Sequence, residues 1–464
     1  MQDKLDYIIN NCYRFTPYLL EGKVITNSGP VLFTTLTRAS IGSMVKIITT
    51  DGKEYSGEVI GIRDTKACIM SYQEIPNINS ETLISLLGEF NGVSVCESML
   101  GRILDFKGMP IDLDSLGPLE GPFKMMSIFG EEINPLMRPV IDKPLDTGIK
   151  VINSFLTLGK GQRIAIMAGS GVGKSVLLGM LARNSTADVN VVALIGERGR
   201  EVREFIEKDL GEEGLKKSIL VVATSDASPM IRIRAAYVAT TIAEYFRDKG
   251  KDVNLMMDSV TRFCMAYREV SLAAGEIPGQ RGHPPSVFSK LPKLLERCGT
   301  KKNSGTITGI YTVLVEGGDL DEPVADSVRS IVDGHFVLSR DLATKNHFPS
   351  IDVLESISRV MSSVISKDHK LVVNYLRDLL AAYRQNEDLI NVGAYVMGSN
   401  DRVDKALKIY QQLMSFLRQD IDETMKLEDC VTQLVKLSQS TKQLELSQDE
   451  LQAQGKLEST FNRL

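Results

Sequence analysis

The chain has 464 residues, of which 43% are hydrophobic and 24% charged, and its formal net charge is −5 at pH 7. This length allows two or three domains, and the composition is typical of a globular protein. General nucleic-acid binders are more often basic, so the acidic balance argues against that class and we expect no nucleic-acid partner.

The sequence indicates neither a membrane span nor a signal peptide. No apolar run approaches the roughly 18 residues that a transmembrane helix needs. The first residues lack the basic and apolar regions of a signal peptide. The six cysteines are scattered without a C-x-x-C pair, which indicates reduced thiols rather than a disulfide framework or a zinc site. We therefore expect a cytoplasmic protein.

Short β-rich segments fill the first part of the chain. They are separated by Gly, Pro and Asn, and a hairpin signal stands at Asp51-Gly52. The clearest segments are Val24-Ile25, Val31–Phe33, Met44–Ile48 and Gly57–Ile62. Closely spaced short strands predict a small β-barrel, which we assign to residues 1–95. Residues 96–150 are rich in Gly and Pro and are expected to be a connecting segment.

Strand and helix patterns alternate between residues 151 and 365. This alternation predicts an α/β fold, with a mostly parallel sheet covered by helices. The strand candidates are Ile164–Met167, Val189–Ile195, Ile219–Ala223, Leu255–Met257, Ile307–Val315 and Phe336–Leu338. Helix candidates begin at Lys174, near Glu201, at Pro229 and at Ser259. Residues 366–440 have a helical pattern, and residues 441–464 form a polar tail, expected to be a solvated helix or a frayed end.

A glycine-rich segment joins the first of these strands to the helix at Lys174. Its sequence is Ala168-Gly169-Ser170-Gly171-Val172-Gly173-Lys174-Ser175. Such a loop turns backbone N–H groups toward nucleotide phosphates, while the Lys neutralises phosphate charge and the Ser hydroxyl ligates Mg²⁺. We expect all eight residues to bind ATP, with Lys174 also catalytic and Ser175 a metal ligand. Ala168 replaces the usual first Gly, but the cradle needs glycine chiefly at positions 169, 171 and 173.

Two acidic residues follow predicted strands and complete the expected site. Asp258 ends an apolar strand and would hold Mg²⁺ beside the loop; capping of the helix at Ser259 is the competing explanation. Glu197 follows another strand, at the sheet edge where α/β proteins bind ligands, and a carboxylate there can activate water. Its neighbour Arg198 could contact phosphate, although a surface Glu–Arg cluster is the commoner origin of such a run.

Several stretches resemble the catalytic subunits of rotary ATPases. They are Lys160–Ser175, Gly196–Val202, Met257–Phe263 and Pro349–Arg359. Within that superfamily the chain is most similar to the ATPases of type III protein export, flagellar or injectisome, whose loop has this form with Ala168. The stretches that carry this narrower resemblance are Ala273–Glu276, Gly282–Phe288, Tyr311–Gly317 and Gly393–Tyr395. The resemblance implies a RecA-like P-loop NTPase core with an N-terminal β-barrel and a C-terminal helical domain.

The resemblance also implies roles for individual residues. Glu197 would be the catalytic carboxylate that activates water, a position where non-catalytic subunits of rotary ATP synthases carry Gln. Asp258 would be the Walker-B-type carboxylate. Arg359 falls on an arginine finger that reaches the neighbouring subunit's site, with a salt-bridged helix Arg as the competing explanation. Phe348 lies where relatives place an aromatic ring against adenine, although a plain core Phe would give the same sequence.

These features predict a Mg²⁺-dependent ATPase that energises type III protein export as a ring at the export gate. We prefer flagellar assembly, with an injectisome ATPase as the alternative, since both branches share the motifs above. A catalytic subunit of an ion-translocating ATP synthase, a hexameric RNA translocase and a binding-only regulator are further alternatives. The form of the loop argues against the first, the acidic balance against the second, and Glu197, Asp258 and Arg359 together against the third.

The resemblance further implies an assembly and a location. One chain carries both the catalytic Glu and the finger Arg, so every interface of a homo-oligomeric ring would be equipped, and the family suggests a hexamer. The implied partners are a stator-like regulator, a coiled-coil stalk protein, export chaperones and substrates, and the membrane export gate. The expected location is the cytoplasm, peripheral to the inner membrane at the export apparatus.

Overall fold

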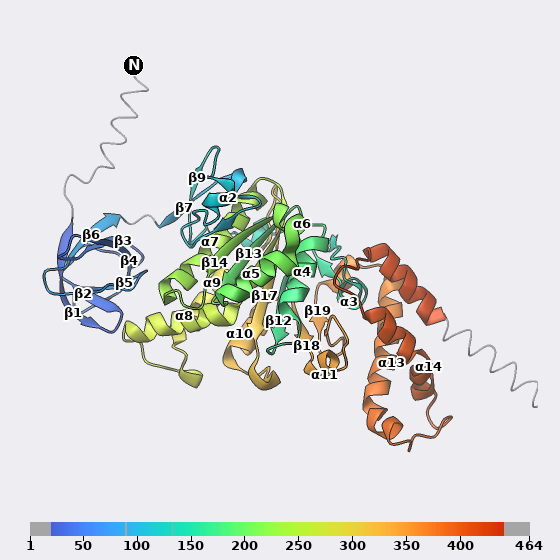
Figure 1. Ribbon diagram of the computed structural model, residues 1–464. Helices are drawn as coiled ribbons and strands as arrows, with labels where there is room; N and C mark the ends of the chain where they lie inside the picture. The colour runs from blue at the N-terminus through green and yellow to red at the C-terminus, as the bar shows by residue number, and fades with distance from the viewer. Residues whose placement is uncertain (1–19, 89–90, 132, 440–464) are drawn as a thin grey trace, which may run out of the picture.

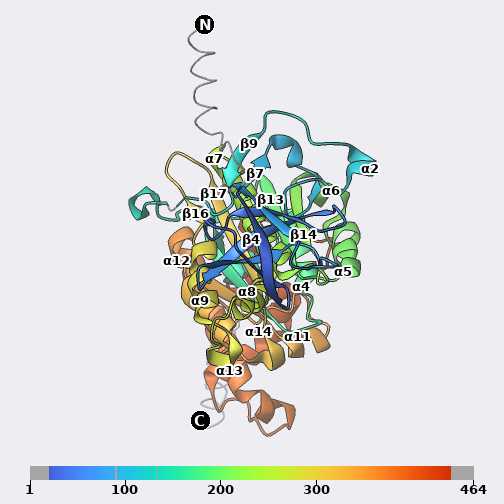
Figure 2. The same ribbon diagram turned by 90° about the vertical axis from the view of Figure 1, so that its left-hand side faces the viewer.

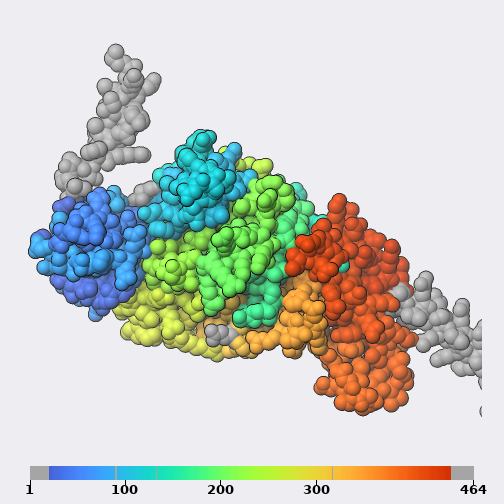
Figure 3. All heavy atoms as spheres, viewed as in Figure 1, coloured from blue at the N-terminus to red at the C-terminus, as the bar shows by residue number. Residues whose placement is uncertain are grey.

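The computed structural model describes residues 20–88, 91–131 and 133–439. A β-barrel, an α/β core and a group of helices follow one another along the long axis of the molecule (Figures 1 and 3). Seen from the barrel end, the barrel lies in front of the core (Figure 2). Among the described residues, no helix combines the length and apolarity needed to cross a membrane. The polar tail expected at residues 441–464 lies outside the described residues, as does Cys12.

Six antiparallel strands close the barrel in the order β1-β2-β5-β4-β3-β6. They are β1 Glu21–Ser28, β2 Val31–Thr34, β3 Met44–Ile48, β4 Glu54–Arg63, β5 Lys66–Ser71 and β6 Leu83–Gly88. Val45 and Ile47 of β3 point inward and pack with Val59 of β4, as the two-residue period of a strand requires. The barrel and its predicted strands are therefore confirmed.

The core is built on a sheet with the strand order β19-β18-β12-β17-β15-β13-β14-β8, and β16 pairs with β17. All pairs are parallel except those of β19 and β16. The strands are β8 Ile103–Leu104, β12 Arg163–Ala168, β13 Val189–Ile195, β14 Ser218–Ala223, β15 Asp252–Asp258, β16 Gly299–Thr300, β17 Thr306–Leu314, β18 Gly334–Leu338 and β19 Ile357–Ser358. All six predicted strands are confirmed, and β8 brings the segment after the barrel into the sheet.

Helices cover both faces of this sheet (Figure 1). They include α4 Lys174–Asn184, α5 Gly199–Glu204, α7 Pro229–Asp248, α8 Val260–Ala273, α9 Pro285–Leu295 and α10 Pro323–Ile331. Along β12, Ala165 and Met167 join the apolar cluster that contains α7 and α8, whereas Ile164 and Ile166 join the cluster that contains α4. A parallel strand buried on both faces has a continuous apolar sequence, which is the pattern that predicted β12.

The C-terminal part of the described chain is helical, as predicted. Its long helices are α13 Lys367–Asn391 and α14 Asp401–Leu417, and residues 427–439 are also helical. The rings of Tyr383 and Tyr410 stack between α13 and α14, with their centroids 3.6 Å apart. The Ser366 hydroxyl caps α13 by accepting a hydrogen bond from the His369 amide.

Candidate active site

The glycine-rich loop joins β12 to α4 at the carboxyl edge of the parallel strands. Gly171 and Gly173 have φ angles of 76° and 88°, in the left-handed region that favours glycine. A side-chain carbon at Gly173 would also lie 3.4 Å from the Phe348 ring. Gly169 shows neither requirement. Ala168 is the buried last residue of β12, paired with Leu314 and Leu338, and its methyl group packs in the apolar cluster that contains α4.

Lys174, Glu197 and Asp258 meet at this edge of the sheet. The Nζ atom of Lys174, at the start of α4, lies 2.5 Å from Oδ1 of Asp258 and 3.2 Å from Oε1 of Glu197. Asp258 ends β15 and Glu197 follows β13, and these two strands are neighbours in the sheet. One ammonium group thus bridges two carboxylates that are 84 and 23 residues away in sequence.

Burial and charge shift the protonation of this cluster. Burial raises the pKa of Glu197 to about 7, helped by the negative charge of Asp258 and opposed by Lys174. Burial disfavours the charge on Lys174, but Asp258 and Glu197 outweigh it, so the pKa of Lys174 lies above its usual range. A carboxyl group with a pKa near neutrality is suited to exchange a proton with water.

The other expected site residues take three different positions. Phe348 is 38% exposed beside Gly173, so it is not a plain core residue. Arg198 precedes α5, and its exposed guanidinium pairs with Glu201 at 3.2 Å, not with the carboxylates around Lys174. Arg359 follows β19 and is exposed; its guanidinium makes no hydrogen bond or ion pair within the described residues. Within the described residues, the alternative explanation of Arg359 as a salt-bridged arginine on a helix is therefore wrong.

Three side chains that the sequence analysis did not single out complete the surroundings. The Thr312 hydroxyl of β17 donates a 2.7 Å hydrogen bond to Oδ1 of Asp258. The buried Ser350 hydroxyl donates a 2.6 Å hydrogen bond to the Val172 carbonyl and thereby anchors the glycine-rich loop. Arg262, in the first turn of α8, has a buried Nε atom without a partner among the described residues. In the sequence, Arg262 stands one turn after Asp258, within the stretch Met257–Phe263 that carries the family resemblance.

The residues at this edge fit a nucleotide with Mg²⁺. The open glycine cradle and the unpaired Nε of Arg262 suit phosphate oxygens. Within the described residues no group of three or more His, Cys, Asp or Glu side chains could hold a metal alone. Mg²⁺ is commonly held by one or two protein oxygens together with substrate phosphates, and Ser175 and Asp258 could supply such oxygens. The five described cysteines are free and buried.

Comparison with known proteins gives consistent matches. Residues 148–358 match the nucleotide-binding domain of the ATP synthase alpha/beta family, and residues 365–436 match the C-terminal domain of the T3SS EscN ATPase. The flagellum-specific ATP synthase of Bacillus subtilis (strain 168) is 49% identical over 419 residues, which cover 90% of this chain and 93% of that protein. The type 3 secretion system ATPase of Xanthomonas euvesicatoria is 44% identical over 418 residues, or 90% and 94%.

Solved structures show the same architecture. The assembled ATPase EscN of the enteropathogenic E. coli type III secretion system superimposes with a TM-score of 0.85 at 43% identity, covering 90% of this chain and all of that chain. EscN in complex with its central stalk EscO gives a TM-score of 0.82 at the same identity and coverage.

The fold and the matched core define an ATPase of the ATP synthase alpha/beta class. Within that class, the chain belongs to the family of flagellum-specific ATP synthases and type 3 secretion system ATPases. The RecA-like core, the N-terminal barrel and the helical C-terminal part expected from the sequence are confirmed.

Proposed function

We propose that this chain hydrolyses ATP with Mg²⁺ to energise type III protein export, with flagellar assembly as the preferred system. The observation that carries the catalytic part is the cluster of Lys174, Glu197 and Asp258 beside an open glycine cradle. Three of the curated relatives with at least 46% identity are flagellum-specific ATP synthases, which supports the flagellar preference.

In this proposal Lys174 binds phosphate through charge. Its ammonium group pairs with Asp258 and Glu197, and phosphate oxygens compete with these carboxylates when ATP binds. Ser175 and Asp258 would hold Mg²⁺, and the bound ion would supply charge neutralisation on the phosphates. The Thr312 hydroxyl fixes the orientation of the Asp258 carboxylate.

Glu197 is the proposed general base. Its carboxylate lies at the same edge of the sheet as the phosphate loop, and its raised pKa lets it accept a proton from water near neutral pH. Arg262 is added to the site as a phosphate ligand, because a half-buried guanidinium with an unpaired buried N–H suits an anion. Arg198 is retained as a weaker phosphate candidate, since nucleotide binding would have to draw it away from Glu201.

The outer site residues are proposed to act at adenine and between subunits. The half-exposed ring of Phe348 lies against the loop and offers a face on which adenine can stack. Arg359 is proposed as a finger that enters the site of a neighbouring subunit in a ring of six. Its exposure and its lack of a partner within the described chain support this role.

The assembly and its partners are also proposals. EscN is described as assembled and in complex with its central stalk EscO, and we extend a homo-hexameric ring and a coiled-coil stalk partner to this chain. A stator-like regulator, export chaperones, substrates and the export gate follow from the family resemblance. We place the ring in the cytoplasm, peripheral to the inner membrane. If sites form between subunits, specific ATPase activity rises with protein concentration; constant specific activity from dilute protein upward would contradict the ring.

We propose five functional parts of the chain. They are a domain of residues 1–95 that contains the barrel, a connecting segment of residues 96–150 that also supplies β8 to the core sheet, the ATPase domain 151–365, the helical domain 366–440 and a tail 441–464. The match of residues 365–436 to the EscN C-terminal domain favours export over an ATP synthase subunit.

A complementation experiment tests the export function. A strain that lacks the gene should regain motility and secretion of flagellar proteins with the wild-type chain. It should not do so with Glu197→Gln at equal protein level. Motility that is unaffected by the deletion would overturn the flagellar assignment, and loss of another secreted set of proteins would then support the injectisome alternative.

A further inference from the structure

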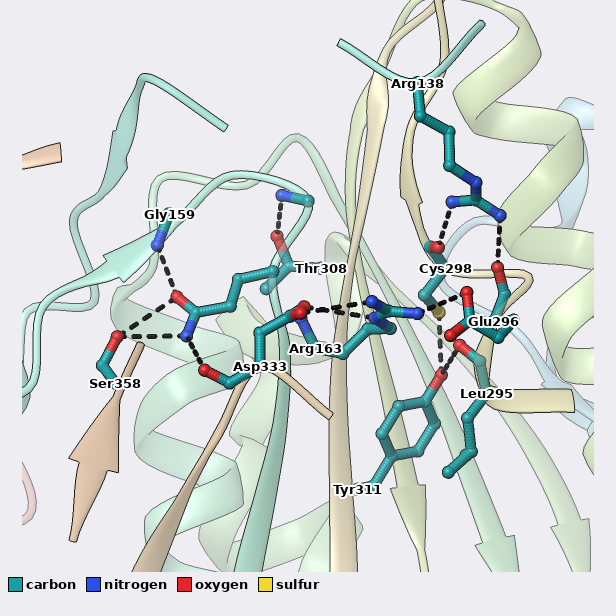
Figure 4. A network of polar contacts seen from close by, with 12 residues as sticks. Arg138, Gly159, Arg163, Leu295, Glu296, Cys298, Thr308, Tyr311, Asp333 and Ser358 are labelled. Carbon is teal, nitrogen blue, oxygen red and sulfur yellow. Dashed lines mark hydrogen bonds and ion pairs between the residues drawn. The ribbon is translucent and has the colours of Figure 1, made fainter. Parts of the chain in front are cut away.

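The backbone next to Arg359 is held by a network of polar contacts that includes Ser358, Asp333 and Arg163, which Figure 4 labels. The network lies at the edge of the sheet where β12 and β18 begin, opposite the phosphate loop. The network joins the start of β12, the residue before β18, and β19. These elements are neighbours, since β18 pairs with β12 on one side and with β19 on the other. The Gln162 amide is hydrogen-bonded to Gly159, Ser358 and Asp333, three residues that Figure 4 labels.

The hydroxyl of Ser358 is held in two directions. It accepts a 3.0 Å hydrogen bond from Nε2 of Gln162 and donates a 2.9 Å bond to the carbonyl of Thr157. Gln162 is itself fully buried, and its Oε1 accepts a 2.9 Å bond from the Gly159 amide. Because both the oxygen and the nitrogen of the Gln162 amide are hydrogen-bonded, the orientation of the amide is fixed, and its nitrogen is the donor to Ser358.

Asp333 holds Arg359, the residue that follows Ser358. Its carbonyl accepts a 2.9 Å hydrogen bond from the Arg359 amide and a 3.3 Å bond from Nε2 of Gln162. Its carboxylate accepts two 3.1 Å bonds from the Arg163 guanidinium, which also pairs with Glu296 at 2.5 Å. The backbone of residues 358–359 is thus fixed by groups on three other segments.

The backbone and the side chain of Arg359 differ in their contacts. The Arg359 amide is anchored to the Asp333 carbonyl, whereas its guanidinium is exposed and has no partner within the described residues. An anchor of this kind does not stabilise the arginine's own charge. It does set where the side chain leaves the surface.

We propose that Ser358 is a positioning residue for Arg359, through its hydrogen bonds to Gln162 and Thr157, and that it acts on the active site of the neighbouring subunit. This inference rests on the proposed role of Arg359 as a finger. A finger stabilises charge that develops in the transition state, so a displaced finger lowers turnover more than it lowers ATP affinity.

The first test separates turnover from binding. In the full-length ring, Ser358→Ala should lower kcat about tenfold, because small displacements of a catalytic group are costly, while the KM and Kd for ATP stay near wild type. Ser358→Thr keeps the hydroxyl and should restore most of kcat. Ser289→Ala, which removes an exposed serine hydroxyl on α9, should leave kcat unchanged. Normal kcat in Ser358→Ala, or a change confined to KM, would overturn the proposal.

The second test asks in which subunit Ser358 acts. Glu197→Gln subunits have an inactive site and an intact finger. Ser358→Ala subunits have an intact site and a displaced finger. Mixed rings should hydrolyse ATP in a single turnover faster than the sum of the two variants alone. A rate equal to that sum would mean that Ser358 acts within its own subunit and would overturn the proposal. Arg359→Ala, measured alongside, decides separately whether the finger exists: normal turnover in that variant would remove the proposed function of Arg359 itself.

Discussion

The ammonium of Lys174 lies 2.5 Å from Oδ1 of Asp258 and is shared with Glu197, so one cation serves two carboxylates. The two acids are unequal partners, because Asp258 also accepts a hydrogen bond from Thr312. Burial and the negative charge of Asp258 raise the pKa of Glu197 to about 7. This difference supports the proposal that Asp258 binds the metal and Glu197 accepts the proton.

We predict that activity depends on pH through Glu197. A protonated carboxyl cannot accept a proton from water, so kcat/KM for ATP should fall as the pH is lowered from 8 to 6, with an inflection at about 7. Steady-state assays in buffers of constant ionic strength measure this profile. A flat profile across that range would contradict the assignment of Glu197 as the base.

The same pKa predicts a pH-dependent stability of the nucleotide-free protein. The folded state keeps the Glu197 proton up to about pH 7, whereas the unfolded chain loses it near the ordinary value of 4.5. The unfolding free energy should therefore fall as the pH rises between these values, with a slope of at most about 1.4 kcal/mol per pH unit from this group. Urea denaturation of Glu197→Gln should lack this contribution, and identical slopes in the two proteins would contradict it.

Phe348 should determine affinity for the base of the nucleotide. Phe348→Ala removes the ring beside the loop and should raise the Kd for ATP roughly fivefold, since aromatic stacking contributes about 1 kcal/mol. The Kd for tripolyphosphate, which has no base, should stay unchanged, and Phe348→Tyr should bind ATP as the wild type does. An equal loss of affinity for both ligands would instead place Phe348 in support of the phosphate loop.

Arg359 should be needed for turnover and dispensable for binding. Arg359→Ala should lower kcat by about 10³-fold with little change in the Kd for ATP. Arg203→Ala removes another exposed arginine and serves as the matched control, with activity retained. Arg359→Ala mixed with Glu197→Gln should regain single-turnover hydrolysis, because each subunit supplies what the other lacks. Loss of folding in Arg359→Ala, measured by thermal unfolding, would reject the finger.

Most of the fold could be predicted because its signals are local. The apolar run 164–167 and the glycines after it lie within a dozen residues, and the structure places β12, the loop and α4 there. The two-residue strands β8 and β19 could not be predicted, because they are too short for a period and are defined only by their partners.

The site shows the same division between local and distant contacts. Glu197 and Asp258 could be found from the sequence because each follows an apolar strand, and parallel strands end at one edge. Thr312 and Ser358 could not, because their roles depend on hydrogen bonds to residues 54 and 196 positions away. Arg262 lies within the stretch 257–263 that carries the family resemblance. Its proposed role could not be predicted, because that role depends on the burial of its unpaired Nε atom.

The most direct test of the central claim is the ATP turnover of Glu197→Gln, measured together with its affinity for ATP and its thermal unfolding. The substitution keeps the shape of the side chain and removes the proton acceptor. We predict that kcat falls by at least about 10²-fold, the lower range of general-base contributions, while the Kd for ATP and the fold are retained. Turnover at the wild-type rate in this variant would contradict the account of the site as a Glu197-dependent ATPase.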